Sequence, residues 1–290
     1  MGGYGWGEVN KQDLIDAVRA ALDAGVTMFD TADTYGLGQS EETLAAALGH
    51  QRENVTIATK FGVRVENGKT FYDNSPQWIR KAVEGSLRRL KTEYIDLYQI
   101  HYRDVVTPIG AVIETLNELK QEGKIRYYGL SNIHKKDIAE LKMYAGAFVS
   151  FQDEYSLACR KNEQDILHLS QEMEMTPLTW GSLGQGILTG KYDKNSTFEA
   201  NDRRSRDIYV NFHGEKLLKN LEIVKELKEI AAQINTSVSS VAIRFILDYI
   251  PQSVVLAGIK SPEQLKGNCD AFGWVLTEEQ LLNLKRVSDD

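Results

Sequence analysis

Three side chains with complementary proton chemistry follow two short apolar runs near the start of the chain. Asp30 comes directly after the run 26–29, and Lys60 comes directly after the run 55–59. Both runs have the length and the β-forming residues of buried strands, so Asp30 and Lys60 are predicted at the carboxyl ends of strands. Tyr35 falls on the loop that follows Asp30. If the two strands are parallel neighbours, the three side chains converge.

Such a convergence would turn a tyrosine into a useful proton donor. An isolated phenol has a pKa of about 10 and exchanges protons poorly near neutral pH. A lysine ammonium at ~4 Å attracts a phenolate by ~4 kcal/mol at an effective dielectric of ~20, which lowers the phenol pKa by up to ~3 before desolvation is subtracted. Asp30 is expected to keep Lys60 charged and oriented. Taken singly, each residue is more ordinarily interpreted as a surface Asp, a loop Tyr or a solvated Lys. The choice between this interpretation and a catalytic one therefore depends on the rest of the sequence.

Composition places the chain among globular proteins and argues against several classes. It has 290 residues, 42% of them hydrophobic and 26% charged, and no apolar run approaches the ~20 residues of a membrane span. The net charge is −7 and the basic residues form no tract, which argues against a nucleic-acid partner. Cys159 and Cys269 give neither a disulfide framework nor a metal-ligand spacing. No export or transit signal is recognisable. We therefore expect a cytoplasmic protein with no membrane partner and no metal.

Short apolar runs alternate with amphipathic helical segments through the rest of the chain. Strands are predicted at 26–29, 55–59, 94–100, 125–130, 148–151, 176–179 and 253–257. Helices are predicted at 11–24, 40–48, 76–90, 108–121, 135–144, 165–172, 215–233, 238–249 and 278–287, with another beginning at 261. The segment 61–75 is predicted to be a polar loop, and 181–212 a long loop of the kind that usually carries function.

The alternation predicts a parallel sheet within one domain spanning residues 1–290. A doubly wound sheet and a closed eight-stranded barrel both fit it. A doubly wound dinucleotide-binding sheet would carry Gly-x-Gly-x-x-Gly after an early strand, and the chain has no such motif there. The glycines of 181–186 come late and are wrongly spaced. The barrel is therefore favoured.

Polar or amphipathic side chains follow every predicted strand. In order they are Asp30, Lys60, His101, Ser131 with Asn132, Gln152, Trp180 and Lys260. The carboxyl ends of barrel strands form one face, and active sites of this fold lie on that face. The pattern is more informative than any single member, and chance alignment explains it poorly.

Several segments in the same order resemble the aldo-keto reductases, a family of (β/α)₈ TIM barrels that use NADPH without a Rossmann fold. They cover nearly the whole chain: GVTMFDTADTYGLGQSEE, IATKFG, YIDLYQIH, GKIRYYGLSN, FQDEYSL, WGSLGQGILTGKY and GIKSPEQLKGN. The sequence is most similar to bacterial reductases akin to the potassium-channel β subunits. The resemblance implies NADPH-dependent reduction of aldehyde or ketone carbonyls to alcohols, or the reverse reaction on a polyol.

The resemblance also assigns roles to the residues that match the family's motifs. Tyr35 would be the general acid that protonates the carbonyl oxygen, with Asp30 and Lys60 behind it. His101 would hydrogen-bond the substrate oxygen and orient it. The remaining histidines are expected to be surface residues. Trp6, Phe61, Tyr102, Phe212 and Trp274 are candidates for an aromatic pocket wall.

A second set of matched residues would hold the cofactor. Ser131, Asn132 and Gln152 would bind the nicotinamide carboxamide, and Trp180 would stack on its ring. The pyrophosphate would lie on the backbone of Gly181, Ser182, Leu183, Gly184, Gln185 and Gly186 and on Lys191, under a strap carrying Arg203, with Arg204 and Arg206 as alternatives. Gly258, Lys260, Ser261, Gln264 and Asn268 would surround the adenosine 2′-phosphate, which predicts a preference for NADPH over NADH.

The beginning of the chain departs from the family pattern. Met1, Gly2 and Gly3 resemble the loop just after the family's first strand, so that strand and the preceding hairpin are expected to be absent from this sequence. We expect a missing N-terminal segment rather than an unusual barrel, because seven strands would leave exposed edges.

Two other functions remain compatible with these motifs. One is a nicotinamide-binding sensor or regulatory subunit with little turnover, which the channel-subunit resemblance allows and the complete set of catalytic residues disfavours. The other is a C=C reductase, which in this family typically replaces the histidine, so His101 argues against it.

Overall fold

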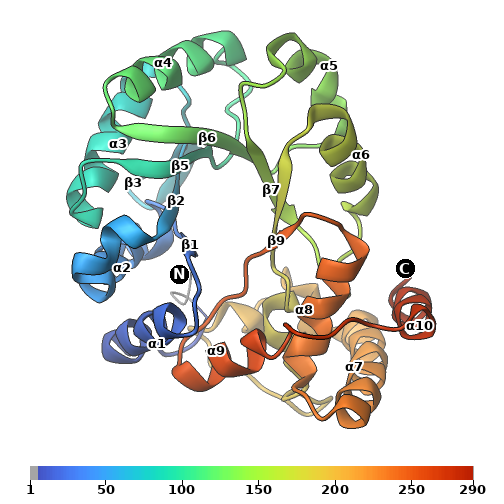
Figure 1. Ribbon diagram of the computed structural model, residues 1–290. Coiled ribbons are helices and arrows are strands. Elements are labelled where there is room, and N and C mark those ends of the chain that lie inside the picture. The colour runs from blue at the N-terminus through green and yellow to red at the C-terminus, as the bar shows by residue number, and fades with distance from the viewer. Residues whose placement is uncertain (1–5, 290) are drawn as a thin grey trace.

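The computed structural model describes residues 6–289, and seven parallel strands form its main sheet. Figure 1 shows this sheet curled, with the helices arranged around its outside. In spatial order the strands are β1 (Met28–Asp30), β2 (Thr56–Phe61), β5 (Ile95–Ile100), β6 (Ile125–Ser131), β7 (Ser150–Glu154), β8 (Thr176–Trp180) and β9 (Val254–Val255). The barrel-type alternation expected from the sequence is confirmed.

The outer layer consists of helices at nearly all of the predicted positions. They are α1 (Lys11–Asp23), α2 (Gln39–Leu48), α3 (Pro76–Leu90), α4 (Ile109–Gln121), α5 (Ile138–Leu141), α6 (Glu163–Met173), α7 (Gly214–Ile234), α8 (Val238–Tyr249), α9 (Pro262–Cys269) and α10 (Glu278–Ser288). Polar capping residues fix the first residues of several helices. The Asn10 side chain accepts hydrogen bonds from two backbone amides of α1, and Ser75 caps α3 ahead of Pro76. The predicted helix at 135–144 is instead a series of short turns around α5.

The two ends of the strand order are β1 and β9, and no pairing between them is found within residues 6–289. In an eight-stranded barrel the first strand occupies this position. Met1, Gly2 and Gly3, which we aligned with the loop after that strand, lie outside the described residues.

The polar loop predicted at 61–75 is wrong, because this segment forms an antiparallel hairpin. Its strands are β3 (Val63–Glu66) and β4 (Lys69–Tyr72), and they turn at Asn67 and Gly68. Both turn residues have positive φ, 51° and 73°. Asn-Gly is the strongest short-range hairpin signal, because these residues tolerate the left-handed backbone that a two-residue turn requires. The Asn67-Gly68 pair was therefore a local signal for this hairpin in the sequence.

Apolar side chains fill the barrel beneath the carboxyl ends of the strands. Ala58, Leu97 and Leu178 form a small buried cluster, separate from the main core between sheet and helices. Each of them precedes by two positions a polar or amphipathic residue, so both residues point to the same face of their strand. The barrel interior is thus apolar in its middle and polar at the carboxyl ends of the strands. A functional site is expected in this polar layer.

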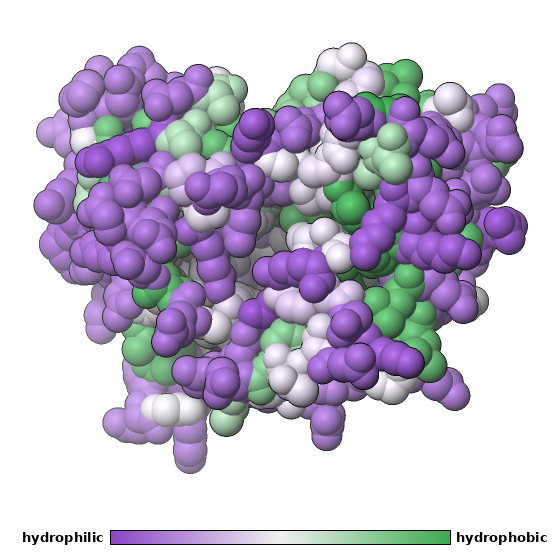
Figure 2. Space-filling view, turned by 90° about the horizontal axis from the view of Figure 1, so that it is seen from below, coloured by the Kyte–Doolittle hydropathy of each residue, from purple (hydrophilic) through white to green (hydrophobic). Residues whose placement is uncertain are grey.

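The outer surface seen in Figure 2 is mostly hydrophilic and is interrupted by hydrophobic areas. No single helix within residues 6–289 is long and apolar enough to cross a membrane; α7 and α8 meet the combined requirement of length and composition only as a pair, which is bent by 97°.

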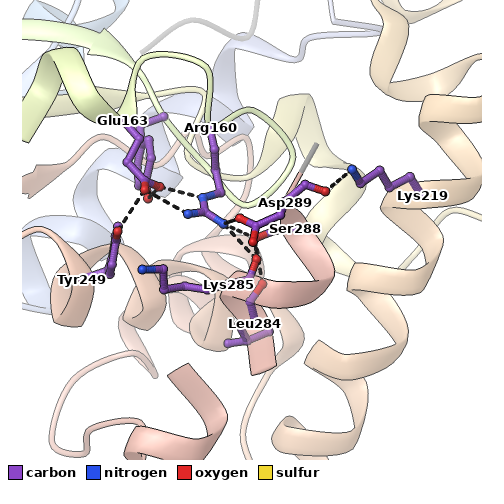
Figure 3. A network of polar contacts seen from close by, with 9 residues as sticks. Arg160, Glu163, Lys219, Tyr249, Leu284, Lys285, Ser288 and Asp289 are labelled. Carbon is purple, nitrogen blue, oxygen red and sulfur yellow. Dashed lines mark hydrogen bonds and ion pairs between the residues drawn. The ribbon is translucent and has the colours of Figure 1, made fainter. Parts of the chain in front are cut away.

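Arg160, on the loop between β7 and α6, ties the C-terminal helix to the barrel (Figure 3). Its guanidinium forms two hydrogen bonds with the Glu163 carboxylate, at 2.6 and 2.9 Å, and donates to the Lys285 carbonyl and the Ser288 hydroxyl at the end of α10. Tyr249 donates to the same carboxylate at 2.9 Å. Burial opposes the charge of Glu163, but these donors outweigh it and lower its pKa.

We expect Arg160→Met to lower the free energy of unfolding by about 3 kcal/mol, because it leaves the buried Glu163 carboxylate without its cation. Urea unfolding measures the loss. The matched control is Arg19→Met, since the Arg19 side chain is 58% exposed and lies 3.8 Å from Asp16; it should change stability by less than about 0.5 kcal/mol. Equal losses in the two variants would contradict the assignment.

Candidate active site

Strand register brings the predicted catalytic residues to one inward face. Asp30 pairs with Ala58, and Lys60, two positions further along β2, pairs with Gln99 on β5. Residues two apart on a strand point to the same side, so Asp30, Lys60 and Gln99 share the barrel interior. Ser131 and Gln152 are paired on β6 and β7 in the same way. The convergence predicted from the sequence is what the parallel register produces.

Lys60 and Asp30 form a buried ion pair at the centre of this face. The Lys60 ammonium donates to both carboxylate oxygens of Asp30, at 2.9 and 2.7 Å, and to the Thr31 carbonyl at 2.9 Å. The Lys60 side chain is fully buried. Burial alone would lower the lysine pKa, but Asp30 and the Tyr35 hydroxyl outweigh it and raise that pKa. Lys60 therefore carries a fixed positive charge at neutral pH.

Tyr35 begins a 3-10 turn (Tyr35–Gly38) beyond β1, with its ring close to both Lys60 and His101. The Lys60 nitrogen lies 5.1 Å from the centroid of the Tyr35 ring, and its positive charge acts on the Tyr35 hydroxyl to lower the pKa of that group. The His101 ring stands edge-on to it, with 5.9 Å between centroids. Burial raises the pKa of Tyr35 and Lys60 offsets only part of this rise. The phenol thus keeps its proton at neutral pH, because the desolvation that the sequence analysis left to be subtracted is larger than the attraction of Lys60.

His101, directly after β5, is an uncharged imidazole at neutral pH. Burial is the main cause that lowers its pKa, to about 3, and the Lys60 charge adds to the effect. Its backbone carbonyl accepts from the Asn132 amide at 2.9 Å. Its Nδ1 atom is buried with no hydrogen-bond partner among residues 6–289. A neutral imidazole held beside a protonated phenol can donate a hydrogen bond to a substrate oxygen without competing for the phenol proton.

Ser131, Asn132 and Gln152 lie together above the ion pair. Asn132 has a φ of 55° and its side-chain amide also donates to the Ser131 hydroxyl, at 3.1 Å. Gln152 donates to Asp30 at 2.8 Å, so in this structure its amide serves the ion pair. Gln99, which the sequence analysis missed, approaches the same carboxylate oxygen at 3.4 Å. Its place two residues before His101 in YIDLYQIH was the available signal.

Sequence reasoning also missed a buried layer of charges behind the ion pair. Glu41 on α2 is fully buried, accepts from the Thr59 hydroxyl at 2.6 Å and pairs with Arg89 of α3 at 2.6 Å. Asp33 lies nearby, and burial, followed by the charge of Glu41, raises its pKa to about 7. The Arg89 side chain reaches inward past Gly38, where a Cβ atom would lie 2.5 Å from it.

The predicted cofactor residues on the 181–186 turn lie next to β7 and β8. Trp180 is paired in register with Glu154, and the Gln185 amide donates to the Glu154 carboxylate at 3.0 Å. Ser182 donates to the Thr179 carbonyl at 2.8 Å. Positive φ values of 67°, 55°, 55° and 106° occur at Gly181, Gly184, Gln185 and Gly186. The turn therefore places backbone amides close to Trp180. Leu183, also predicted to contact the pyrophosphate, belongs to the same turn.

A cluster of cations lies where the phosphate groups were predicted. Lys260 is close to Arg204 and Lys191, and burial together with these charges lowers its pKa, while Asp202 opposes the effect. The Lys260 ammonium and the Arg204 guanidinium both donate to the Trp6 carbonyl. Three cations with one carboxylate leave an excess of positive charge. This arrangement suits a phosphate-bearing ligand.

The other predicted phosphate residues surround the beginning of α9. Ser261 caps this helix by accepting from the Gln264 amide at 3.4 Å, and the Gln264 side chain accepts from the Lys260 amide at 2.9 Å. The side-chain nitrogen of Asn268 is buried with no partner among residues 6–289, which leaves a donor for a ligand. Gly258 is exposed. These residues fit a phosphorylated nucleotide.

Two of the arginines predicted for the strap, Arg203 and Arg204, lie in different surroundings. The Arg203 guanidinium lies 5.8 Å from the centroid of the Trp6 ring, whereas Arg204 belongs to the cation cluster and also contacts Asp202. No group of three or more His, Cys, Asp or Glu side chains that could hold a metal ion is found within residues 6–289.

Comparison with known proteins identifies the family. The aldo/keto reductase family model matches residues 1–289. The chain is 35% identical to the aldo-keto reductase YhdN of Bacillus subtilis, covering 100% of this chain and 88% of the relative. It is 29% identical to the NADH-specific methylglyoxal reductase of Escherichia coli, covering 99% and 91%.

Solved structures agree with this match. A glycerol dehydrogenase from Gluconobacter oxydans is similar with a TM-score of 0.88 and 36% identity, over 99% of this chain and 88% of that one. An aldo/keto reductase from Klebsiella pneumoniae, in complex with NADP and acetate, is similar with a TM-score of 0.74 and 26% identity, over 96% and 86%. With its barrel-type sheet and a family match along its length, the chain belongs to the aldo/keto reductase family.

Proposed function

We propose that this protein is an NADPH-dependent oxidoreductase that reduces aldehyde or ketone carbonyls to alcohols, with Tyr35 as the proton donor. The observation that carries the proposal is the buried contact of Lys60 with both Asp30 and Tyr35, beside a neutral His101. Membership of the aldo/keto reductase family supports the reaction class. The Klebsiella relative in complex with NADP supports the cofactor.

Each group in the site has a distinct part in this reaction. Bound NADPH supplies the hydride that adds to the carbonyl carbon. The Tyr35 hydroxyl, protonated at neutral pH, gives its proton to the carbonyl oxygen as negative charge develops there. Lys60 stabilises the resulting phenolate, and Asp30 holds the ammonium in place. His101 donates a hydrogen bond to the same substrate oxygen and orients it.

The cofactor residues would hold the nucleotide along the carboxyl ends of β6 to β9. Ser131 and Asn132 would bind the carboxamide, Trp180 would stack on the nicotinamide ring, and Lys260 with Arg204 would bind the phosphates. We propose one barrel domain over residues 1–290. Free Cys159 and Cys269 fit a reducing cytoplasm, which is its proposed location.

Lys260→Ala is expected to weaken NADPH binding roughly tenfold and NADH binding less than about twofold, because a charge-assisted contact with the 2′-phosphate is lost. Fluorescence titration with each nucleotide measures both dissociation constants. The control is Lys266→Ala, which replaces an exposed lysine on α9, the helix that begins two residues after Lys260; it should change neither dissociation constant. Cofactor preference varies among the relatives, since the Escherichia coli relative is NADH-specific. Equal losses of affinity for NADPH and NADH in Lys260→Ala would overturn the 2′-phosphate assignment.

The proposed function is tested by NADPH consumption with a panel of small aldehydes and ketones. We expect turnover with at least one carbonyl and the appearance of the matching alcohol. NADPH binding without turnover of any substrate would instead support the sensor or regulatory-subunit alternative.

A further inference from the structure

A polar cavity of about 590 Å³ adjoins the candidate active site. Asn132 and Trp180, both assigned to the nicotinamide, form part of its wall. Tyr102, Asp153 and Glu154 form another part. The cavity therefore adjoins the proposed nicotinamide site, and its wall is built largely from side chains that form hydrogen bonds.

The Tyr102 ring is held in place from several sides. It stacks on His101, with 5.1 Å between centroids and 26° between planes, and on Tyr72 of the β3–β4 hairpin, with 5.3 Å and 29°. Asn74 donates to the Tyr102 carbonyl at 3.2 Å and exchanges two hydrogen bonds with Asp104, at 2.8 and 2.7 Å. The hairpin and the 102–104 segment are thereby joined, so the phenol cannot turn freely.

The Tyr102 hydroxyl has no hydrogen-bond partner within residues 6–289, although its ring is fixed. Burial raises its pKa, followed by the phenols of Tyr72 and Tyr35 and then by Glu154 and Asp153. It is therefore a neutral group at physiological pH that can both donate and accept.

The charged side chains around this hydroxyl are largely neutralised by one another. Lys161 lies 3.3 Å from Glu154, and the His134 ring lies 3.6 Å from Asp153. Arg103, which also lines the cavity, is paired with Glu140 at 2.8 Å and lies 3.6 Å from Asp137. Paired charges favour a neutral ligand with several hydroxyl groups over a strongly charged one or an apolar one.

We propose that this cavity takes the hydroxylated part of the substrate and that Tyr102 hydrogen-bonds a hydroxyl group close to the carbonyl. The substrate class is a short hydroxyaldehyde or hydroxyketone. The proposal rests on the proposed reductase function and deepens it: His101 orients the carbonyl oxygen, and the Tyr102 ring stacked on it presents its hydroxyl to the neighbouring part of the substrate.

The test compares glyceraldehyde with propanal, which has the same carbon chain without the two hydroxyls. We expect the wild-type protein to have a higher kcat/KM for glyceraldehyde. Tyr102→Phe should lower the glyceraldehyde-to-propanal ratio of kcat/KM about tenfold, because a site built around a hydroxyl partner loses that discrimination when the partner is removed. The larger part of the loss should fall on the kcat/KM for glyceraldehyde.

Tyr72→Phe is the matched control, because it removes a phenol hydroxyl from the same aromatic stack but outside the cavity wall. It should leave the ratio unchanged. NADPH affinity, measured by fluorescence, should be unaltered in both variants and shows that they are folded. A ratio that Tyr102→Phe leaves unchanged, or a wild-type preference for propanal, overturns the Tyr102 assignment while the reductase function stands. Wild-type protein that reduces neither aldehyde nor any other carbonyl overturns the function and this proposal together.

Discussion

Tyr35→Phe should lower kcat/KM for carbonyl reduction about a thousandfold while leaving NADPH affinity within about twofold. The phenylalanine keeps the ring beside His101 and removes only the hydroxyl that contacts Lys60. A positioned general acid contributes roughly 10²–10⁴ in rate, and no other neutral acid among the four candidate residues replaces it. The loss should appear in kcat, because the proton is transferred only in the chemical step.

Steady-state kinetics with a carbonyl substrate and NADPH, combined with fluorescence titration of the cofactor, measure both quantities. Tyr128→Phe is the control for loss of a buried phenol, since the Tyr128 hydroxyl donates to Asn117 of α4 at 2.9 Å, away from the site. It should retain activity within about twofold. Full activity in Tyr35→Phe would show that another group donates the proton.

Asp33→Asn is the second substitution with a large expected effect: it should stabilise the protein at about pH 8 much more than at about pH 5. The folded-state pKa of Asp33 is about 7, against an ordinary value of 3.8. Between these values the folded protein holds a proton that the unfolded chain has released. Stability therefore falls as the pH rises through this window and changes no further above about pH 7.

A folded-state pKa about 3 above the ordinary value corresponds to about 4 kcal/mol of lost unfolding free energy once Asp33 is ionised. This value is the upper limit of the stabilisation that Asp33→Asn can give at about pH 8. The cause is burial, reinforced by Glu41 and partly offset by Arg89 and Lys60. Tyr35 and Tyr98 also face this carboxyl group. Urea unfolding of both proteins at the two pH values gives the difference. A gain that is the same at both values would show that Asp33 does not titrate in this window.

The sequence could predict that these side chains lie on one face of the barrel, because that prediction needs only the positions at which the strands end. Asp30, Lys60 and His101 each come where a recognisable strand ends, and parallel strands bring such positions together whatever the loops do. The hairpin at β3–β4 had an equally local signal, Asn67-Gly68, and was missed only because 61–75 was judged by its polarity.

Other features depend on burial and on loop paths, which one sequence does not reveal. The pKa of Tyr35 is raised because desolvation exceeds the attraction of Lys60, and desolvation follows from packing of distant segments. Arg203 and Arg204 are adjacent, so only the path of the backbone decides which one joins Lys260. Asp33 looks like any loop aspartate until α2 and α3 enclose it.

Hydride transfer itself is the central claim, and an isotope label follows it most directly. NADPH carrying deuterium at both C4 positions of the nicotinamide would be incubated with the protein and the carbonyl substrate that it turns over best, and the product examined by mass spectrometry and NMR. We predict an alcohol with one deuterium on the carbon that was the carbonyl, formed by the wild-type protein and nearly absent with Tyr35→Phe. An alcohol without deuterium at that carbon would contradict the account.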